Sequence, residues 1–150
     1  MMSRLGATGV LAAIVIAGPA AVASATPSSG ITGVTLAQYT VGGTDYILRE
    51  LTIAPGGTTG WHFHDGTLYA AVRSGRLSHY TATCTPDGDH PTGNLFTEQP
   101  GGDHVHIGRN EGTEPLVLEV LYVLPTGSPL AEDAPAPGCC LPDAITTAAS

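Results

Sequence analysis

The sequence predicts an all-β domain of about eight short strands, arranged as a sandwich or a barrel. Gly and Pro are abundant, at 20 and 12 of 150 residues, which is typical of a chain with many turns between short strands. Apolar runs of strand length alternate with clusters of Gly, Pro and Asp,. After the N-terminal segment, no amphipathic helical stripe extends over twelve residues,.

Each expected strand is an apolar or alternating run that ends at a turn signal. In chain order these runs cover residues 34–40, 46–53, 60–64, 68–72, 76–81, 95–98, 104–107 and 116–124. The turn signals between them lie at residues 42–43, 55–57, 65–66, 74–75, 86–88, 100–102 and 125. Residues 126–150 form a Pro-rich C-terminal tail, and its last twenty residues are expected to have little structure of their own.

Residues 1–25 have the composition of a secretory signal peptide. Arg4 provides the positive charge, residues 5–17 are apolar, and Ala23-Ser24-Ala25 fits a small-x-small cleavage site. The alternative is an uncleaved membrane anchor, for which the purely apolar core of this segment is short. We therefore expect a secreted protein in which residues 26–150 form one domain.

The charge balance excludes two classes of partner. The chain contains five Arg, no Lys and 13 acidic residues, so its formal net charge is −8. Phosphate backbones and anionic lipid headgroups repel such an acidic chain. We expect neither nucleic acid binding nor membrane association after signal cleavage.

The three cysteines, Cys84, Cys139 and Cys140, are an odd number for a secreted chain,. In an oxidising compartment we expect a disulfide between Cys84 and either Cys139 or Cys140. Adjacent cysteines rarely pair with each other, so the third cysteine stays free or pairs between chains. The bridge would tie the C-terminal tail to the body of the domain.

The strongest functional signal is a pair of histidines one residue apart, His62 and His64. Because side chains alternate along a strand, both imidazoles lie on the same face. A third histidine, His106, lies on a later predicted strand. Three imidazoles from two strands can hold a divalent transition metal. The alternative is that these are packed or surface histidines without a ligand.

The spacing around these histidines resembles the two motifs of the cupin superfamily. The first motif is matched by Gly56, His62, His64 and Gly75. The second is matched, with one extra residue on either side of its Pro-x-Gly, by Gly93, Pro100, Gly102, His106 and Asn110. The resemblance covers about residues 53–125 and implies a single-domain antiparallel jelly-roll barrel, with a metal held by His62, His64 and His106.

The chain departs from the first motif at the position of its glutamate. Leu68 occupies that place, with Tyr69 beside it. Without a carboxylate, three neutral imidazoles suit Zn or Cu better than the ions that prefer oxygen ligands. Outside the cell the order of metal affinities favours the same two ions. We therefore expect Zn or Cu as the cofactor, with Fe, Ni and Mn as alternatives.

Other side chains are weaker candidates for the site. His104 would face the same way as the motif histidine two residues later, which makes it a candidate fourth ligand. Tyr69 and Glu98 are candidate catalytic proton carriers, although a solvated carboxylate at a sheet edge is the simpler interpretation of Glu98. His79 and His90 are expected to be ordinary strand and loop residues.

Trp61 and Phe63 alternate with the motif histidines and are therefore expected to point away from the metal. An exposed Trp-Phe pair is uncommon on a monomer, so this surface is expected to be covered. The cover is either the N-terminal strand or a second copy of the chain in a homodimer.

Two functions are compatible with this pattern. The first is an exported protein that binds metal, or a small molecule at a metal, without turnover. The second, implied by the resemblance, is a metal-dependent enzyme of dioxygenase or isomerase type that acts on a small oxygenated compound. An open, partly polar pocket around Leu68, Val72, Leu77 and Leu95 would favour catalysis, whereas a filled apolar one would favour metal holding. A metal-free barrel that serves in adhesion or assembly is a third alternative.

Overall fold

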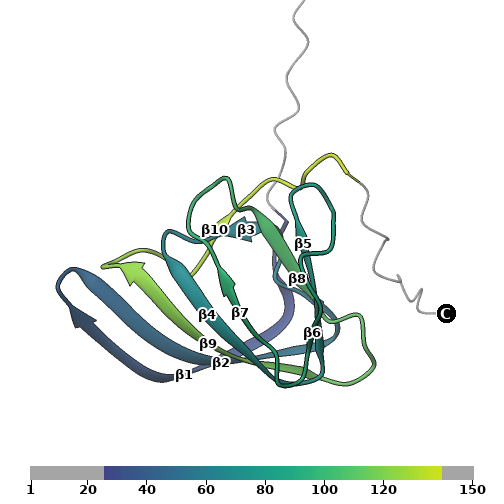
Figure 1. The fold of residues 1–150 in the computed structure, drawn as a ribbon, viewed down its shortest axis with the longest axis horizontal. Helices are drawn as coiled ribbons and strands as arrows, with labels where there is room; N and C mark the ends of the chain where they lie inside the picture. The colour runs from purple at the N-terminus through teal and green to yellow at the C-terminus, as the bar shows by residue number, and fades with distance from the viewer. Residues whose placement is uncertain (1–25, 140–150) are drawn as a thin grey trace, which may run out of the picture.

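A computed structural model describes residues 26–139, and within this range the chain forms ten β-strands and no helix (Figure 1). Each of the expected strands is present, which confirms the all-β prediction. The strands are β1 (Ser29–Val41), β2 (Thr44–Thr58), β3 (His62–Phe63), β4 (Thr67–Ser74), β5 (Arg76–Thr81), β6 (His90–Pro91), β7 (Leu95–Glu98), β8 (His106–Arg109), β9 (Leu116–Pro125) and β10 (Glu132–Asp133).

Two strands, β6 and β10, were not predicted, because two residues are too few to show a period in the sequence,. The predicted signal peptide and Cys140 lie outside the described residues. In the part of the chain that the structure describes, no helix is long and apolar enough to span a bilayer.

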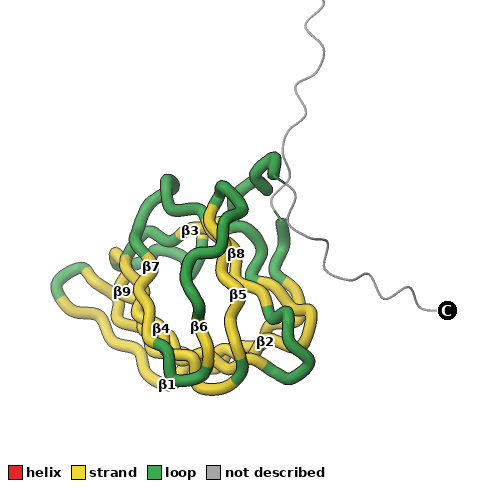
Figure 2. The backbone as a smooth tube through the Cα atoms, turned by 45° about the vertical axis from the view of Figure 1, so that its right-hand side comes forward, coloured by secondary structure: helices red, strands yellow, loops and turns green. Residues whose placement is uncertain are grey.

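The strands close into an antiparallel barrel of two curved sheets (Figure 2). One sheet has the order β1-β2-β9-β4-β7. The other contains β10, β3, β8, β5 and β6, and it joins the first where Thr58 of β2 pairs with Arg109 of β8. The predicted antiparallel jelly-roll barrel is therefore confirmed.

The apolar core fills the closed part of the barrel. Every second residue of β9 is buried, from Leu116 to Leu124, and these side chains pack against Leu68, Val72 and Leu77. Burying one such side chain stabilises a fold by about 2 kcal/mol. Three of the four residues expected to line an interior pocket are therefore core residues. The expectation for the fourth residue was wrong, because Leu95 is 75% exposed on the outside of the barrel.

The Asn110 side chain joins β2 to the loop that follows β8. Its side chain is 2% exposed; its amide nitrogen donates to the carbonyl oxygens of Ile53 (2.9 Å) and Glu114 (2.8 Å), and its oxygen accepts from the amide of Gly112 (3.0 Å). The motif asparagine therefore satisfies backbone groups at a strand end, as a buried polar side chain must.

Replacing Asn110 with alanine is expected to lower the free energy of unfolding by about 3 kcal/mol, because it leaves buried carbonyl groups without donors. Urea denaturation of both proteins measures this difference. Asn110→Asp is the matched variant: it keeps the size of the side chain, but it cannot donate to two carbonyls, so it should be destabilised to a similar extent. A fully stable Asn110→Asp protein would contradict this interpretation.

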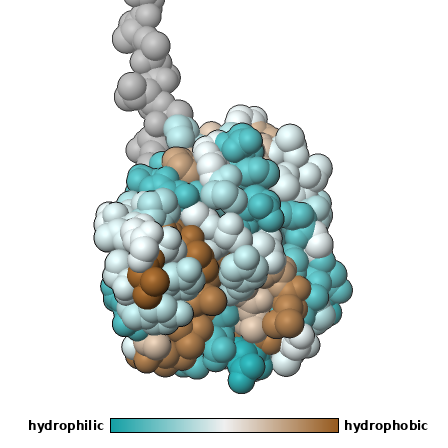
Figure 3. Space-filling model, turned by 60° about the vertical axis from the view of Figure 1, so that its left-hand side comes forward, coloured by the Kyte–Doolittle hydropathy of each residue, from teal (hydrophilic) through white to brown (hydrophobic). Residues whose placement is uncertain are grey.

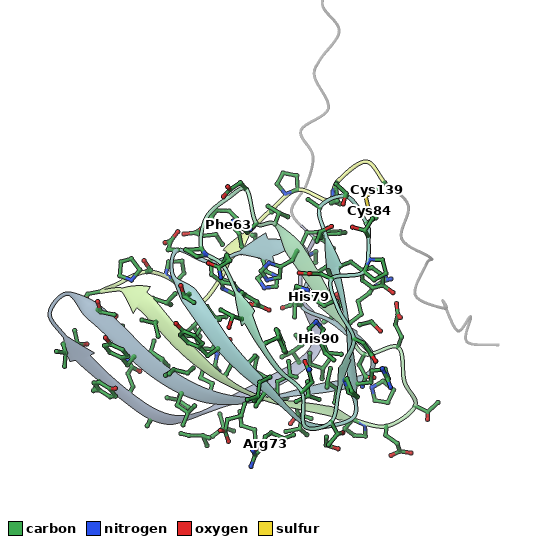
Figure 4. All side chains as sticks on the ribbon, viewed as in Figure 1. Phe63, Arg73, His79, Cys84, His90 and Cys139 are labelled. Carbon is green, nitrogen blue, oxygen red and sulfur yellow. A yellow bond between two sulfur atoms is a disulfide. The ribbon has the colours of Figure 1, made fainter. Side chains whose placement is uncertain are left out.

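The C-terminal segment, residues 130–139, is folded against the barrel. Its strand β10 pairs with β3, and the backbone amide of Ala134 donates to the carbonyl of Trp61 at 2.9 Å. A disulfide joins Cys139 to Cys84 (Figure 4). The expectation of a tail with little structure was therefore wrong for this segment, because a distant strand and a covalent bond supply the contacts that its own sequence lacks.

The same segment explains why Trp61 is buried. The indole is 5% exposed and packs in a small cluster with Ile107 and Ala134, against which Phe63 also packs. The cover over this surface therefore includes the C-terminal segment of the chain itself. Among residues 26–139, the expected N-terminal strand contributes no residue to this cluster, and a second copy as a further cover stays a prediction.

Candidate metal centre

Three buried histidines meet at one end of the barrel interior. His62 of β3 and His106 of β8 are a cross-strand pair, and His64 follows β3 by one residue. Their ring centroids lie 4.4 to 5.2 Å apart, and each residue is at most 7% exposed. One ligand atom from each ring lies within 4.8 Å of the others. The alternation along β3 and the pairing of β3 with β8 thus bring all three predicted ligands together.

Backbone carbonyls orient each of the three rings. The Nδ1 atoms of His62, His64 and His106 lie 2.9, 2.7 and 2.7 Å from the carbonyl oxygens of Gly60, Leu130 and His104 respectively. A carbonyl oxygen can only accept, so each Nδ1 carries the proton and donates it. The Nε2 atom of each neutral ring is then left with a free lone pair, as metal-binding histidines require.

Glu98 of β7 brings a carboxylate to the same place. Its Oε2 lies 3.0 Å from Nε2 of His64 and 3.5 Å from Nε2 of His106, and its side chain is 14% exposed. Glu98 is the direct cross-strand partner of Leu68, the residue at the motif glutamate position. The interpretation of Glu98 as a solvated edge carboxylate was therefore wrong. Its strand could be predicted, but the pairing of β7 with β4 that turns it inward could not.

The histidines around Glu98 determine its charge state. Burial alone would raise the pKa of this carboxyl, but the contacts with His106, His64 and His79 together hold the pKa well below its usual range. Burial likewise opposes protonation of His106, yet the nearby Glu98 carboxylate raises the pKa of this imidazole. Glu98 is therefore a negatively charged carboxylate, and it favours a positive charge at the imidazole nitrogens beside it.

Oε2 of Glu98 faces Nε2 of His64 and of His106, and a ring nitrogen of His62 lies within 4.8 Å of the ligand nitrogens of both these histidines. Nε2 of His64 and Nε2 of His106 are buried and make no hydrogen bond to any described residue, although both lie near Glu98. Lone pairs that face a carboxylate at 3.0 to 3.5 Å repel it unless a proton on one of the imidazoles or a metal cation lies between them,. A space of about 50 Å³ bordered by all four side chains is large enough for an ion,. These residues fit a divalent transition metal held by three nitrogens and one oxygen.

The pKa of His62 predicts how acid destabilises the metal-free protein. Burial, followed by the nearby His106 and His64, lowers the pKa of this imidazole from 6.5 to about 3. Between these two values the unfolded chain binds a proton at His62 that the folded chain does not, so stability falls as the pH is lowered from 6.5 towards 3.

The expected loss at pH 4 from this one group is on the order of 3 kcal/mol. Urea denaturation of the metal-free protein and of the His62→Gln variant between pH 7 and pH 4 measures it. The variant should lose less stability over this range than the wild type. If the free energy of unfolding fell equally with pH in the two proteins, the result would contradict a neutral, buried His62.

His79 adds a further ring behind Glu98, and the expectation of an ordinary strand residue was wrong. It is 5% exposed, with Nε2 3.4 Å from Oε1 of Glu98 and Nδ1 3.5 Å from Oδ2 of Asp87, and neither nitrogen makes a hydrogen bond to the described residues. His79, Glu98 and His106 form a second group of potential ligands with atoms within 4.8 Å of one another.

His90 is also buried, but its contacts are structural. Its Nδ1 lies 2.8 Å from Oδ1 of Asn94, its Nε2 lies 2.6 Å from the carbonyl oxygen of Asp87, and its ring packs on Phe96 at 4.4 Å. Both His79 and His90 are labelled in Figure 4. The sequence offered one signal for His79: it lies two residues after Leu77 on the alternating strand β5, and both of these residues are buried.

Two sequence candidates lie away from the centre. His104 is half exposed in a turn closed by its own amide and the carbonyl of Gly101, so it does not share the face of His106. Its role is to supply the backbone carbonyl that orients His106. Tyr69 is 52% exposed on the outer face of β4. Both predictions were wrong, for different reasons. His104 precedes the strand that begins at His106, so the alternation of that strand does not apply to it. Tyr69 lies on a strand, but on its outward face.

A partly polar cavity of about 620 Å³ adjoins two of the four candidate ligands, Glu98 and His106. Its walls include Glu98, His79 and His106 from the centre and Phe96 and Val105 as apolar surface. Its outer part is lined by hydroxyl and carboxylate groups from Thr81, Thr83, Thr85, Asp87 and Asp103. The cavity therefore connects the candidate metal position with the outside.

Comparison with known proteins supports the fold. No protein-family model matches the chain, and no curated protein matches it. Among solved structures, the chain is similar to a cupin domain from Bordetella pertussis, with 20% identity, coverage of 65% of this chain and 95% of the other, and a TM-score of 0.52. The chain has the cupin fold.

Two further solved structures are similar to this chain, with comparable sequence identity and TM-scores. One is a protein with a double-stranded β-helix domain from Klebsiella pneumoniae, at 20% identity, 73% and 90% coverage and a TM-score of 0.54. The other is the polyketide cyclase RemF from Streptomyces resistomycificus, at 20% identity, 73% and 75% coverage and a TM-score of 0.57. At this identity the likeness concerns the fold alone, so the function depends on this chain's own residues.

Proposed function

We propose that this cupin-fold protein binds a divalent transition metal through His62, His64, His106 and Glu98, and that the ion captures a small molecule entering by the adjoining cavity. The observation that carries the proposal is the convergence of acceptor atoms: two buried Nε2 atoms without hydrogen bonds face one carboxylate oxygen at 3.0 and 3.5 Å. A cation at this point would satisfy all of them.

Glu98 changes the expected choice of metal. A set of three imidazoles and one carboxylate admits Fe²⁺ and Mn²⁺ as well as Zn²⁺ and Cu²⁺, because the oxygen ligand meets the preference of the harder ions. Zn or Cu still come first in our proposal, since metals bound outside the cell compete by affinity. Export itself is supported by the composition of residues 1–25 and by the Cys84–Cys139 disulfide, a bond typical of oxidising compartments,.

Metal analysis of the protein from the exported fraction, purified without added metal, tests the proposal. We expect one transition ion per chain in the wild type and none in His62→Ala. His104→Ala is the matched control, because it removes a half-exposed imidazole next to the centre without removing a proposed ligand, and it should keep its metal. A wild type that neither contains metal nor takes it up on titration would refute the proposal.

A metal-dependent enzyme is the second candidate, favoured by the cavity. Apart from the space of about 50 Å³ at the candidate metal position, the interior around Leu68, Val72 and Leu77 is apolar core, but an open and partly polar cavity reaches Glu98 and His106. A bound metal would supply Lewis acidity or dioxygen activation, and the cavity walls would orient the substrate. Dioxygen uptake by iron-loaded protein with catechol as the probe tests the dioxygenase form of this candidate: uptake that His106→Ala abolishes indicates an enzyme, and no uptake counts against dioxygenase chemistry on catechol.

A further inference from the structure

We propose that His79, Glu98 and His106 form an entry site, which binds a divalent transition ion from the adjoining cavity before it reaches His62 and His64. The inference rests on the proposed function, because it concerns how that metal centre is loaded. It assigns a role to His79, a buried histidine that is not among the four proposed ligands.

Two hollow spaces of the barrel share one wall. The outer cavity, of about 620 Å³, leads to the outside, and the inner space, of about 50 Å³, lies among the proposed ligands. His62 and His64 border the inner space alone. The side chains that border both spaces are His79, Phe96, Glu98 and His106. An ion that enters by the outer cavity therefore meets this wall before it meets His62 and His64.

The shared wall contains a ligand group of its own. One potential ligand atom from each of His79, Glu98 and His106 lies within 4.8 Å of the other two. Two imidazole nitrogens and one carboxylate oxygen suit the same transition ions as the inner centre. The two groups have Glu98 and His106 in common, so the passage from one to the other only exchanges His79 for His62 and His64.

The two oxygens of Glu98 face the two ligand groups. Oε1 lies 3.4 Å from Nε2 of His79, and Oε2 lies 3.0 Å from Nε2 of His64. A carboxylate can bind a cation through either oxygen or through both. Glu98 can therefore stay bound throughout the exchange by changing the oxygen that it uses, so that a negatively charged ligand is present at every stage.

His79 differs from a histidine that only packs in the core. It is 5% exposed, yet neither of its ring nitrogens makes a hydrogen bond to the described residues. In contrast, both ring nitrogens of His90 have partners. Nδ1 of His79 faces Oδ2 of Asp87 at 3.5 Å, and a proton on this nitrogen leaves the lone pair of Nε2 directed at Glu98. In that tautomer the two electron-rich atoms repel each other, and a cation beside them removes the repulsion.

The mouth of the outer cavity favours cations. Asp87 and Asp103 line it with side chains that are 62% and 84% exposed. No described arginine lines it, and the chain contains no lysine. Clefts lined by one sign of charge concentrate ions of the opposite sign and accelerate their association. The large hydrophobic side chains that are at least half exposed lie elsewhere among the described residues, and Figure 3 shows brown apolar areas on the side of the molecule where β1 lies.

Stopped-flow mixing of the metal-free protein with excess Co²⁺ tests the proposal, and the visible absorption of the bound ion is the signal. In His79→Phe we expect the association rate constant to fall at least about 10-fold. The dissociation constant, measured by competition with a chromophoric chelator, should stay within about threefold of the wild-type value. The reason is that an entry site changes the rates of loading and release by the same factor and leaves the final ligands unchanged. Phenylalanine keeps a buried ring at this position and removes no hydrogen bond.

His79→Gln is the second variant. Its amide can donate to Oε1 of Glu98 and so hold the carboxylate in place, but it lacks the imidazole nitrogen, so it should slow uptake as well. His104→Ala is the matched control, because it removes a half-exposed imidazole from the wall of the same cavity and keeps the backbone carbonyl that accepts from His106. Its association rate constant should equal that of the wild type.

Three results would overturn the inference. Wild-type association rate constants in whichever His79 variants are folded would show that the ion reaches the centre without His79. A raised dissociation constant with an unchanged association rate constant would assign His79 to the positioning of Glu98. A wild type that binds no Co²⁺ would refute the proposed function and this inference with it, so the two failures are distinguishable. Circular dichroism verifies that each variant is folded.

Discussion

Replacing Glu98 with leucine is expected to weaken metal binding by at least about 100-fold, the upper end of the loss seen when only an outer-shell partner is removed. The reason is that Oε2 of Glu98 is the only carboxylate oxygen placed against His64 and His106 in the described part of the chain. Competition with a chromophoric chelator measures the affinity. An unchanged affinity would show that Glu98 is not a ligand.

The cross-strand pairing of Leu68 with Glu98 provides a rescue variant. In the double variant Leu68→Glu/Glu98→Leu, the carboxylate moves to the neighbouring strand, to the position where the cupin motif has its glutamate, while the composition of the chain stays the same. We expect most of the lost affinity to return. A stably folded double variant without metal would mean that the two positions do not present a carboxylate to the same point.

Glu98→Gln is expected to stabilise the metal-free protein, although it weakens metal binding. A glutamine amide can donate to Nε2 of His64 or His106, each of which lacks a hydrogen bond. The variant should therefore lose metal affinity and at the same time gain about 1 kcal/mol of stability as the metal-free protein. Opposite signs in these two measurements would separate a ligand from a residue that only supports the fold.

Removing the disulfide is expected to have the second large effect. Cys84→Ser opens a loop that spans a sequence separation of 55 residues, which costs about 4 kcal/mol in the chain-entropy description. Urea denaturation measures this loss, and Cys139→Ser should reproduce it. Equal stability of the wild type and both variants would contradict a bridge between these two cysteines.

The same variant should also weaken the metal centre. The disulfide closes the segment in which Leu130 accepts from Nδ1 of His64 and in which β10 pairs with β3. Losing an outer-shell partner of a metal-binding histidine typically lowers metal affinity about 10- to 100-fold. We expect a loss of this size in Cys84→Ser. The affinity is measured without urea, at a temperature where the variant is folded. Full affinity would show that the segment stays in place without its covalent bond.

Much of the fold and part of the site could be read from the sequence. The alternation of apolar residues predicted strands such as β5 and β9, because the period of a strand is local. The same property put His62 and His64 on one face. Gly56 and Gly75, which both adopt positive φ, and the buried Asn110 occupy the motif positions that made the spacing informative.

Only the tertiary structure showed where Glu98, His79 and Leu130 lie. Glu98 reaches the site because β7 pairs with β4 in a register that sets it opposite Leu68, and Leu130 does so because the C-terminal segment returns to β3. Register and return path depend on contacts between residues far apart in the chain, and a shift of one residue would turn each side chain to the other face. The alternation within each strand is therefore readable from the sequence, whereas the composition of the site depends on how the strands pair.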